Sequence, residues 1–286
     1  MVKSAQVRIL QAPRRRWKRG LWWAGFYALL GGLVVTFLWP FLWMVLCSMR
    51  TQAQNTSIPP TWLFTPTLEN YRNVFTRVPF FQYILNSIIV SGSATVLALL
   101  FGVFAAYGVA RGKLYRVGLL VLAARMIPVV SYLVPWFVMF RAAGMIGSYT
   151  PIVATHLVLT LPFIVWLMVG FFEDVPADLL DAARIDGCSG FRAFRQIALP
   201  IAMPGIVVSA ILAFNASWNN LLLALVLGGA QIRTLPVTVY YFHRDTHVDW
   251  GGINAAAILV TLPVVISTLL VQRYFVRGIT LGSTKG

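Results

Sequence analysis

The sequence predicts an all-α, polytopic membrane protein with six transmembrane helices. Hydrophobic residues make up 59% of its 286 residues and charged residues only 11%, whereas a soluble domain carries about a quarter charged residues. The apolar residues gather in long segments, each exceeding the ~20 residues that a helix needs to cross the hydrocarbon core of a membrane. These segments cover approximately residues 21–46, 82–107, 117–140, 151–172, 201–227 and 253–275.

The first apolar segment is expected to remain in the protein as a span. It is longer than the apolar core of a secretory signal, and no A-x-A cleavage pattern follows it. The predicted spans divide the chain into a membrane domain at 21–280 and three polar parts. The polar parts are a basic N-terminal tail at 1–20, a loop between spans four and five at 173–200, and a C-terminal tail at 281–286.

The distribution of Lys and Arg predicts how the spans are oriented. Basic residues concentrate in the N-terminal tail, after spans two and four, and at the C-terminus. Because cytoplasmic loops are enriched in Lys and Arg, both termini and residues 173–200 are predicted to be cytoplasmic. The net charge of +15 is divided among these flanking segments and forms no single basic face, so nucleic-acid binding is not expected.

Span two carries a small residue at every fourth position. This spacing places the small side chains on one helical face, where another helix can approach closely. The stripe predicts a fixed packing seam, with a sliding surface used in gating as the alternative. Its members are Ala94, Ala98, Gly102, Ala106 and Ala110.

Two polar features within the predicted spans are candidates for a solute pathway. Arg125 stands inside span three, where a charge is costly unless it faces the bundle interior or water. It either ties a helix kinked at Pro128 and Pro135 to a neighbour or lines the pathway. Span five holds a polar group that forms either interfacial and packing contacts or a surface for a hydroxylated solute. The candidates in that group are Asn215, Trp218, Asn219 and Asn220.

The acidic residues and the known motifs limit the function classes. All eight acidic residues lie outside the predicted spans, whereas a cation-coupled transporter usually needs a carboxylate at membrane depth. The sequence has no G-x-x-x-x-G-K-[ST] phosphate loop, and His243 and His247 have no further ligand nearby to complete a metal site. We therefore expect no catalysis, cofactor or metal in this chain, and a partner that supplies the energy. A self-contained secondary transporter and a non-transporting membrane scaffold are the alternatives.

The stretch "DAARIDGCSGFRAFRQIALP" at residues 181–200 is the expected docking site for that partner. Pro176 is predicted to begin a helix that Gly187 caps at its C-terminus. Ser189 is predicted to cap a second short helix, before Pro200 opens span five. The resulting helix–Gly–helix elbow suits a partner's groove, and an elbow packed on its own bundle is the alternative. Its apolar surface is expected to come from Leu179, Ala183, Phe191 and Phe194, and charges on one turn from Asp181 and Arg184.

This stretch resembles the EAA loop of the membrane subunits of binding-protein-dependent ABC importers. The matching positions are Asp181, Ala182, Ala183, Gly187, Ile197, Leu199 and Pro200. Asp181 stands where the family usually has Glu, so the charge is kept on a shorter side chain. "PTLENYRNVF" at 66–75, "AAYGVAR" at 105–111, "RMIP" at 125–128 and "WNNLLLAL" at 218–225 resemble the carbohydrate branch, the maltose-type inner subunit in particular. The resemblance covers essentially the whole chain.

The resemblance implies a permease subunit that forms half of a translocation pathway for a sugar or sugar derivative. The implied partners are cytoplasmic ABC ATPase subunits that bind ATP and Mg, a second permease subunit and an extracytoplasmic solute-binding protein. The implied location is the cytoplasmic (inner) membrane of a bacterium or archaeon. Loop 229–252 is implied to reach toward the docked binding protein. The residues implied to couple the spans to the ATPase are Asp181, Ala182, Ala183, Arg184, Gly187, Phe191, Leu199 and Pro200.

Overall fold

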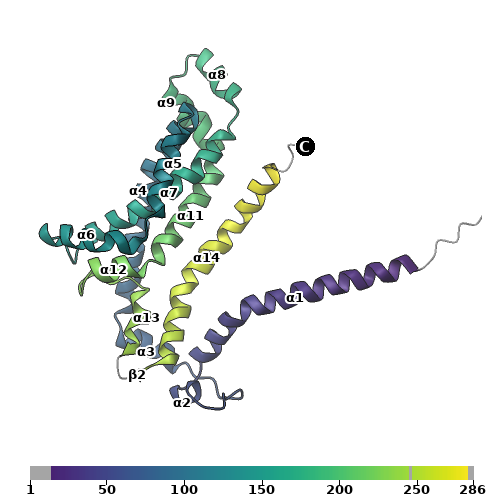
Figure 1. Cartoon of the computed structure of the whole chain (residues 1–286), viewed down its shortest axis with the longest axis vertical. Helices are drawn as coiled ribbons and strands as arrows, with labels where there is room; N and C mark the ends of the chain where they lie inside the picture. The colour runs from purple at the N-terminus through teal and green to yellow at the C-terminus, as the bar shows by residue number, and fades with distance from the viewer. Residues whose placement is uncertain (1–13, 245–246, 283–286) are drawn as a thin grey trace, which may run out of the picture.

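The computed structural model describes residues 14–244 and 247–282, and this part of the chain is almost entirely helical (Figure 1). Its only strands are β1 (His243–Arg244) and β2 (His247–Val248), which form a two-stranded antiparallel hairpin. The predicted all-α fold class is therefore confirmed. Most of the predicted tails at 1–20 and 281–286 lies outside the described residues, and the orientation of the termini remains a prediction.

Four helices in the described part are long and apolar enough to cross a membrane unbroken. They contain the segments predicted as spans one, two, four and six. A 33-residue helix such as α4 rises ~50 Å, which exceeds the hydrocarbon thickness and carries its end beyond the membrane. These helices are α1 (Arg14–Ser48), α4 (Phe80–Gly112), α7 (Tyr149–Glu173) and α14 (Trp250–Gly282).

The predicted span at 117–140 is not one continuous helix. It consists of α5 (Tyr115–Ala123), the short 3-10 turn η1 (Ala124–Met126) and α6 (Val129–Ala142), and the two halves meet at 83°. The break lies at Ile127 and Pro128, whose backbone is extended. Proline disfavours a helical conformation in the residue before it and donates no backbone hydrogen bond. The expected kink is therefore a sharp corner.

The predicted span at 201–227 is also interrupted. Helix α10 (Leu199–Ile201) meets α11 (Met203–Trp218) at Ala202, and the segments on either side form an angle of 73°. A second break at Asn219–Asn220 separates α11 from α12 (Leu221–Leu227). The Asn220 side-chain oxygen accepts a hydrogen bond from the Leu223 backbone N–H at 3.2 Å, which makes Asn220 the N-cap of α12.

Helices α4 and α7 pack side by side and form the centre of the bundle with α11. The small residues of the α4 stripe are all buried on this side. A Cβ atom placed on Gly102 would lie 2.8 Å from Ile164 Cγ2 of α7. The two helices are therefore in close contact at Gly102, the smallest residue of the stripe. The predicted packing seam is therefore present, as expected where small residues let backbones approach.

Helix α1 diverges from this bundle, and only its C-terminal part lies close to it. There α1 contacts the N-terminal part of α14 (Figure 1). Every described side chain from Trp22 to Leu42 is exposed in the isolated chain. Tryptophan, phenylalanine and leucine side chains dominate this stretch, so they need an apolar environment outside the chain. Lipid and a second subunit are the two environments that a membrane complex offers.

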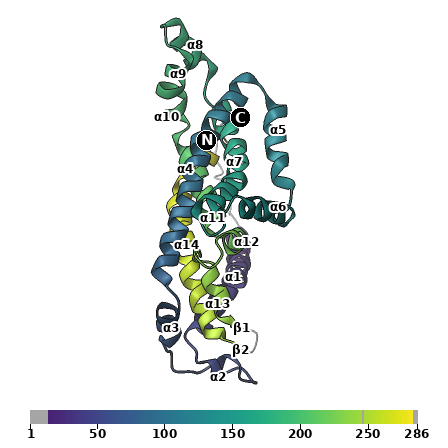
Figure 2. The same ribbon diagram turned by 90° about the vertical axis from the view of Figure 1, so that its left-hand side faces the viewer.

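The two ends of the bundle differ in structure (Figures 1 and 2). At one end project α8 (Ala177–Ile185), α9 (Gly190–Ala193) and the single π-helical turn η2 (Phe194–Ala198). At the other end lie α2 (Gln52–Asn55), α3 (Glu69–Arg77), α13 (Val237–Tyr241) and the β1–β2 hairpin. The positive-inside prediction places the first end in the cytoplasm and the second outside.

Candidate coupling and solute sites

The elbow formed by α8 and α9 has the caps that the sequence predicts. Gly187 has a φ of +83°. Its N–H donates to the Arg184 carbonyl at 3.0 Å, and the Cys188 N–H donates to the Ala183 carbonyl at 2.9 Å. These two bonds form a Schellman motif, which ends α8. Ser189 then starts α9, because its hydroxyl accepts the Arg192 N–H at 3.3 Å.

Phe194 anchors the elbow to the long helices. Its ring is 4% exposed, and its centroid lies 4.7 Å from that of Tyr107 on α4 and 6.1 Å from that of Phe172 on α7. Leu180 and Ala183 of α8 are buried in the same apolar cluster. The elbow is therefore packed on α4 and α7.

Arg111 adds a polar link between α4 and the start of the elbow. Its Nη2 donates to the backbone carbonyls of Phe172, at 3.3 Å, and Val175, at 3.0 Å. The Phe172 carbonyl belongs to the last turn of α7 and Val175 follows that helix, so the negative end of the helix dipole favours a cation here. The resemblance at "AAYGVAR" included this arginine, and the structure shows which groups it binds.

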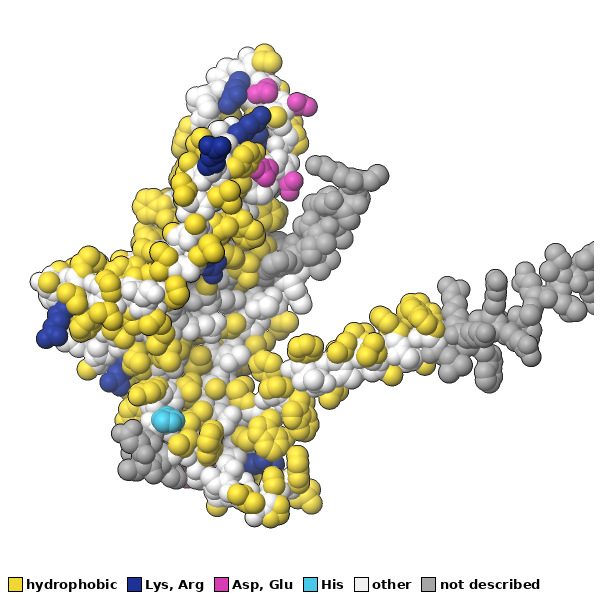
Figure 3. Space-filling model, viewed as in Figure 1, with side chains coloured by type: hydrophobic (Ala, Val, Ile, Leu, Met, Phe, Trp, Pro, Cys, Tyr) yellow, Lys and Arg dark blue, Asp and Glu magenta, His cyan; other side chains and the backbone are white. Residues whose placement is uncertain are grey.

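The exposed tip of the elbow combines apolar and charged side chains. Ile185 is 87% exposed and Phe191 64% exposed. Asp181 and Arg184 form an ion pair at 3.3 Å that is open to solvent and stabilises the chain little. Figure 3 shows basic and acidic side chains together around this projecting end. Such a mixed surface is suited to a protein partner.

The structure corrects two of the four expected apolar surface residues. Leu179 and Phe191 are exposed, whereas Ala183 and Phe194 are buried against the bundle. Ile185 was not among the predicted surface residues of the elbow. It follows the exposed Ala182 by three residues and so lies on the same helical face. Leu199 is half-buried and Pro200 exposed in α10, the next helix along the chain from the π turn. Their part in coupling remains a prediction.

Replacing Gly187 with valine should weaken coupling without disturbing the spans. A Cβ atom at Gly187 would meet nothing within 4 Å, so its cost is backbone strain of about 1–2 kcal/mol at positive φ. We expect ATP-driven uptake to fall several-fold in reconstituted vesicles at an unchanged protein yield. Gly187→Asn is the matched control, because asparagine tolerates the left-handed conformation. Equal uptake by the valine and asparagine variants would contradict this role of Gly187.

Most of the polar group predicted in span five serves packing. Trp218 is 3% exposed, and its Nε1 donates to the Val260 carbonyl of α14 at 3.1 Å. The Asn215 Oδ1 accepts a hydrogen bond from the Ser267 hydroxyl of α14 at 2.8 Å. Asn219 is exposed, and its Nδ2 donates to the Asn215 carbonyl one turn earlier at 2.9 Å. These contacts tie α11 to α14 and to its own last turn, which favours the packing interpretation for Trp218 and Asn215.

Arg125 and Asn220 instead lie together on the wall of a cavity of about 210 Å³. The guanidinium of Arg125 stacks over the Phe163 ring of α7, 4.7 Å from its centroid. His156 of α7 also lines this cavity, and its Nδ1 lies 2.6 Å from the Ser217 hydroxyl oxygen. We call this space the inner cavity. It lies near the corner between α5 and α6 and near the break between α11 and α12, between the two ends of the bundle.

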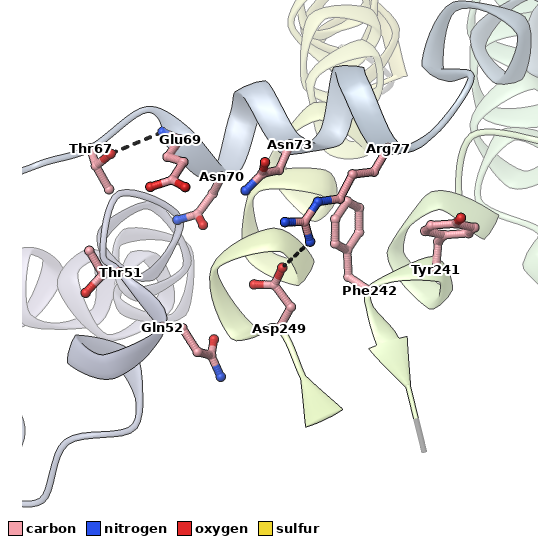
Figure 4. A pocket seen from close by; sticks show the side chains of 10 residues that line it. All are labelled: Thr51, Gln52, Thr67, Glu69, Asn70, Asn73, Arg77, Tyr241, Phe242 and Asp249. Carbon is pink, nitrogen blue, oxygen red and sulfur yellow. Dashed lines mark hydrogen bonds and ion pairs between the residues drawn. The ribbon is translucent and has the colours of Figure 1, made fainter. Parts of the chain in front are cut away.

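A larger polar pocket, of about 370 Å³, opens at the end opposite the elbow (Figure 4). We call it the outer pocket. Arg77 of α3 and Asp249 bridge it at 3.8 Å. At the rim of the pocket, the side chain of Gln52 connects α2 to the segment that contains Asp249. Its Nε2 donates to the Val248 carbonyl, and its Oε1 accepts from the Trp250 N–H. The residues that line the pocket are Thr51, Gln52, Thr67, Glu69, Asn70, Asn73, Arg77, Tyr241, Phe242 and Asp249.

The comparison with protein families decides between the alternatives for this membrane protein. Residues 98–281 match the family described as binding-protein-dependent transport system inner membrane component. The chain belongs to this family. The match covers the elbow, the inner cavity and part of the outer pocket. The chain is thus a multi-pass inner-membrane permease component, as the resemblance at residues 181–200 implied.

Curated relatives match this permease over nearly their whole length. The sulfoquinovosyl glycerol transport system permease protein SmoH of Agrobacterium fabrum is 37% identical, over 89% of this chain and 91% of that protein. The trehalose transport system permease protein SugB of Mycobacterium tuberculosis is 35% identical, over 92% and 98%. The trehalose/maltose transport system permease protein MalG of Thermococcus litoralis is 32% identical, over 89% and 94%.

Solved structures show the same fold at lower identity. A chain of a bacterial ABC transporter involved in the import of the acidic polysaccharide alginate superposes with a TM-score of 0.71. It is 20% identical to the permease, and the match covers 96% of this permease and all of that chain. At this level of identity the likeness shows the fold alone.

Proposed function

We propose that this permease forms half of the pathway of an ABC importer for a sugar or sugar derivative. In the proposed importer, ATP and Mg are held by separate ATPase subunits that dock on the elbow. The observation that carries the proposal is the elbow, an apolar and charged tip that projects beyond the long helices on a glycine-capped turn. Phe194 and Arg111 connect that tip to α4 and α7, so a moving ATPase has a path to the spans.

The solute class is inferred from the relatives. The three named relatives are permeases of transport systems for trehalose, trehalose/maltose or sulfoquinovosyl glycerol. All three solutes are sugars or sugar derivatives. The host is proposed to be a bacterium or archaeon, with the elbow on the cytoplasmic side of its membrane as the basic residues predict.

A second permease subunit is the proposed partner of α1. The surface of this helix from Trp22 to Leu42 is apolar and exposed. The helix diverges from the bundle, so the bundle does not cover that surface. Apolar faces of this extent in a membrane complex are covered by lipid or by another subunit. A second chain would also complete the pathway, of which this permease is proposed to form one half.

The outer pocket is the proposed contact for the extracytoplasmic binding protein. It combines amide, carboxylate and guanidinium groups with the exposed edge of Tyr241, a composition typical of protein recognition. It includes Tyr241, Phe242 and Asp249 from loop 229–252, which the resemblance implied to face the binding protein. The lining residues come from two distant parts of the sequence, 51–77 and 241–249, which the fold brings together.

Tyr241→Ala should lower the affinity for the loaded binding protein and leave basal ATP hydrolysis unchanged. Tyr241 is 37% exposed on the pocket wall, and truncation of an interface tyrosine costs about 1–2 kcal/mol, or roughly five- to thirtyfold in affinity. Tyr240→Ala is the matched control, since Tyr240 is 59% exposed and does not line the pocket. Stimulation of the ATPase by titrated binding protein measures both variants. An equal loss in both variants would argue against the pocket as the contact.

Purification in mild detergent, followed by reconstitution, tests the proposed function as a whole. We expect an ATPase subunit and a second permease to accompany the tagged chain, and sugar uptake into vesicles to require ATP. Uptake by this chain alone, driven by an ion gradient, would favour a secondary transporter. Purification without an ATPase, and without uptake in any condition, would favour a scaffold.

A further inference from the structure

Polar side chains from several elements line part of the inner cavity. Arg125 comes from η1, Tyr132 from α6, His156 from α7 and Asn220 from the break before α12. Each of the two interrupted spans thus contributes residues at or near its break. A broken helix at membrane depth is tolerated where it is buried in protein or lines a polar cavity. Residues at or near both breaks therefore line the same cavity.

The inner cavity has one charged lining residue, Arg125, while the hydroxyls of Tyr132, Thr160 and Ser217 can donate or accept hydrogen bonds. Arg125 offers guanidinium N–H groups, and no acid within residues 14–244 and 247–282 forms an ion pair with it. The Asn220 Oδ1 is occupied by the Leu223 N–H, which leaves its amide NH₂ as a donor. None of the residues lining the cavity is acidic. The positive charge of Arg125 therefore has no opposite charge within the cavity, and a carboxylate or sulfonate would supply one, whereas a neutral sugar would not.

His156 is buried among the residues that line the inner cavity. The residue is 1% exposed, and its Nε2 has no hydrogen-bond partner within the described structure. The Ser217 hydroxyl lies on the opposite ring nitrogen, Nδ1, at 2.6 Å. When that hydroxyl donates to Nδ1, Nε2 carries the proton and is a further donor. Nε2 is itself buried, so it does not face the open space, and the charge that a solute meets there comes from Arg125.

We propose that the inner cavity binds the acidic group of a sugar derivative, a carboxylate or a sulfonate, during passage. This inference rests on the proposed function and specifies the solute contact of this chain. The arginine supplies charge and a planar fork of donors that matches such a group. A volume of about 210 Å³ is below the range of drug-sized pockets, so it admits one ring or its substituent and not an oligosaccharide.

Charge-selective cysteine labelling tests the proposal on the assembled transporter without requiring transport. Cys47 and Cys188 are replaced by alanine, and Ala216, an exposed residue that lines the cavity, is changed to cysteine. The probes are two methanethiosulfonates of similar size, one bearing a sulfonate and one a trimethylammonium. We expect Arg125→Gln to lower the ratio of the sulfonate rate to the ammonium rate about fivefold, because it removes a positive charge next to the thiol.

Three further measurements decide the outcome. Arg125→Lys should preserve most of the ratio, and Arg141→Gln should not change it, since Arg141 also stacks on a phenylalanine but does not line the cavity. Glucuronate should slow the labelling more than glucose does at the same concentration. An unchanged ratio in Arg125→Gln, or equal protection by the two sugars, would overturn the acidic-group site. Loss of ATPase co-purification would instead overturn the proposed function, and the labelling ratios would still report on the cavity.

Discussion

Replacing Phe194 with alanine should reduce ATP-driven uptake by more than tenfold. The ring is 4% exposed and fills the space between Tyr107 and Phe172, so its removal leaves a cavity where the elbow meets α4 and α7. Truncation of a buried phenylalanine costs about 3–5 kcal/mol. The elbow would then move without carrying the long helices. Uptake and ATP hydrolysis, measured on the same vesicles, should separate: hydrolysis persists while transport is lost.

Phe191→Ala provides the contrast that makes this result interpretable. Phe191 lies on the same elbow, three residues earlier, but it is 64% exposed. Its truncation should leave the elbow folded and weaken capture of the ATPase, so hydrolysis and uptake should fall together. If Phe191→Ala and Phe194→Ala gave the same pattern, Phe194 would not be the link between the elbow and the spans.

This pair also shows how far the sequence predicts the elbow. The caps at Gly187 and Ser189 follow from local backbone chemistry, and both are present. Phe191 and Phe194 stand three residues apart and lie side by side, with ring centroids 6.3 Å apart. Sequence spacing cannot say which ring faces the bundle, because the bundle and a partner protein are both apolar surfaces. That choice depends on the packing of α4 and α7 against the π turn.

The breaks in the spans were harder to predict. The hydropathy of residues 117–140 and 201–227 predicts two continuous transmembrane helices, because most of the residues at the breaks are themselves apolar. Pro128 indicated a kink, but an 83° corner also requires the extended backbone at Ile127. Asn220 belongs to the polar group predicted within span five, and its role as a helix cap was not predicted. Its amide oxygen caps the start of α12, and Asn220 lines the inner cavity together with Arg125.

The α4 stripe was predicted from its four-residue period, and the structure adds the identity of its tightest contact. Gly102→Leu should prevent α4 and α7 from packing, because even a Cβ atom there would lie 2.8 Å from Ile164 Cγ2 and 3.3 Å from Ile164 Cβ. Overpacking costs about 1–3 kcal/mol and occasionally more. We expect a lower yield of folded complex and a melting temperature lower by at least about 5 °C, measured by thermal aggregation in detergent.

Gly108→Leu is the matched control for this change, because Gly108 is exposed on α4 and a Cβ atom there meets nothing within 4 Å. It should leave the melting temperature nearly unchanged. The double variant Gly102→Ala, Ile164→Ala should be destabilised by less than the sum of the two single variants, since the shorter side chain at 164 makes room for the added methyl group. Equal stability of the two leucine variants would mean that α4 and α7 separate readily. That result would return the stripe to its alternative interpretation, a surface along which the two helices slide during gating.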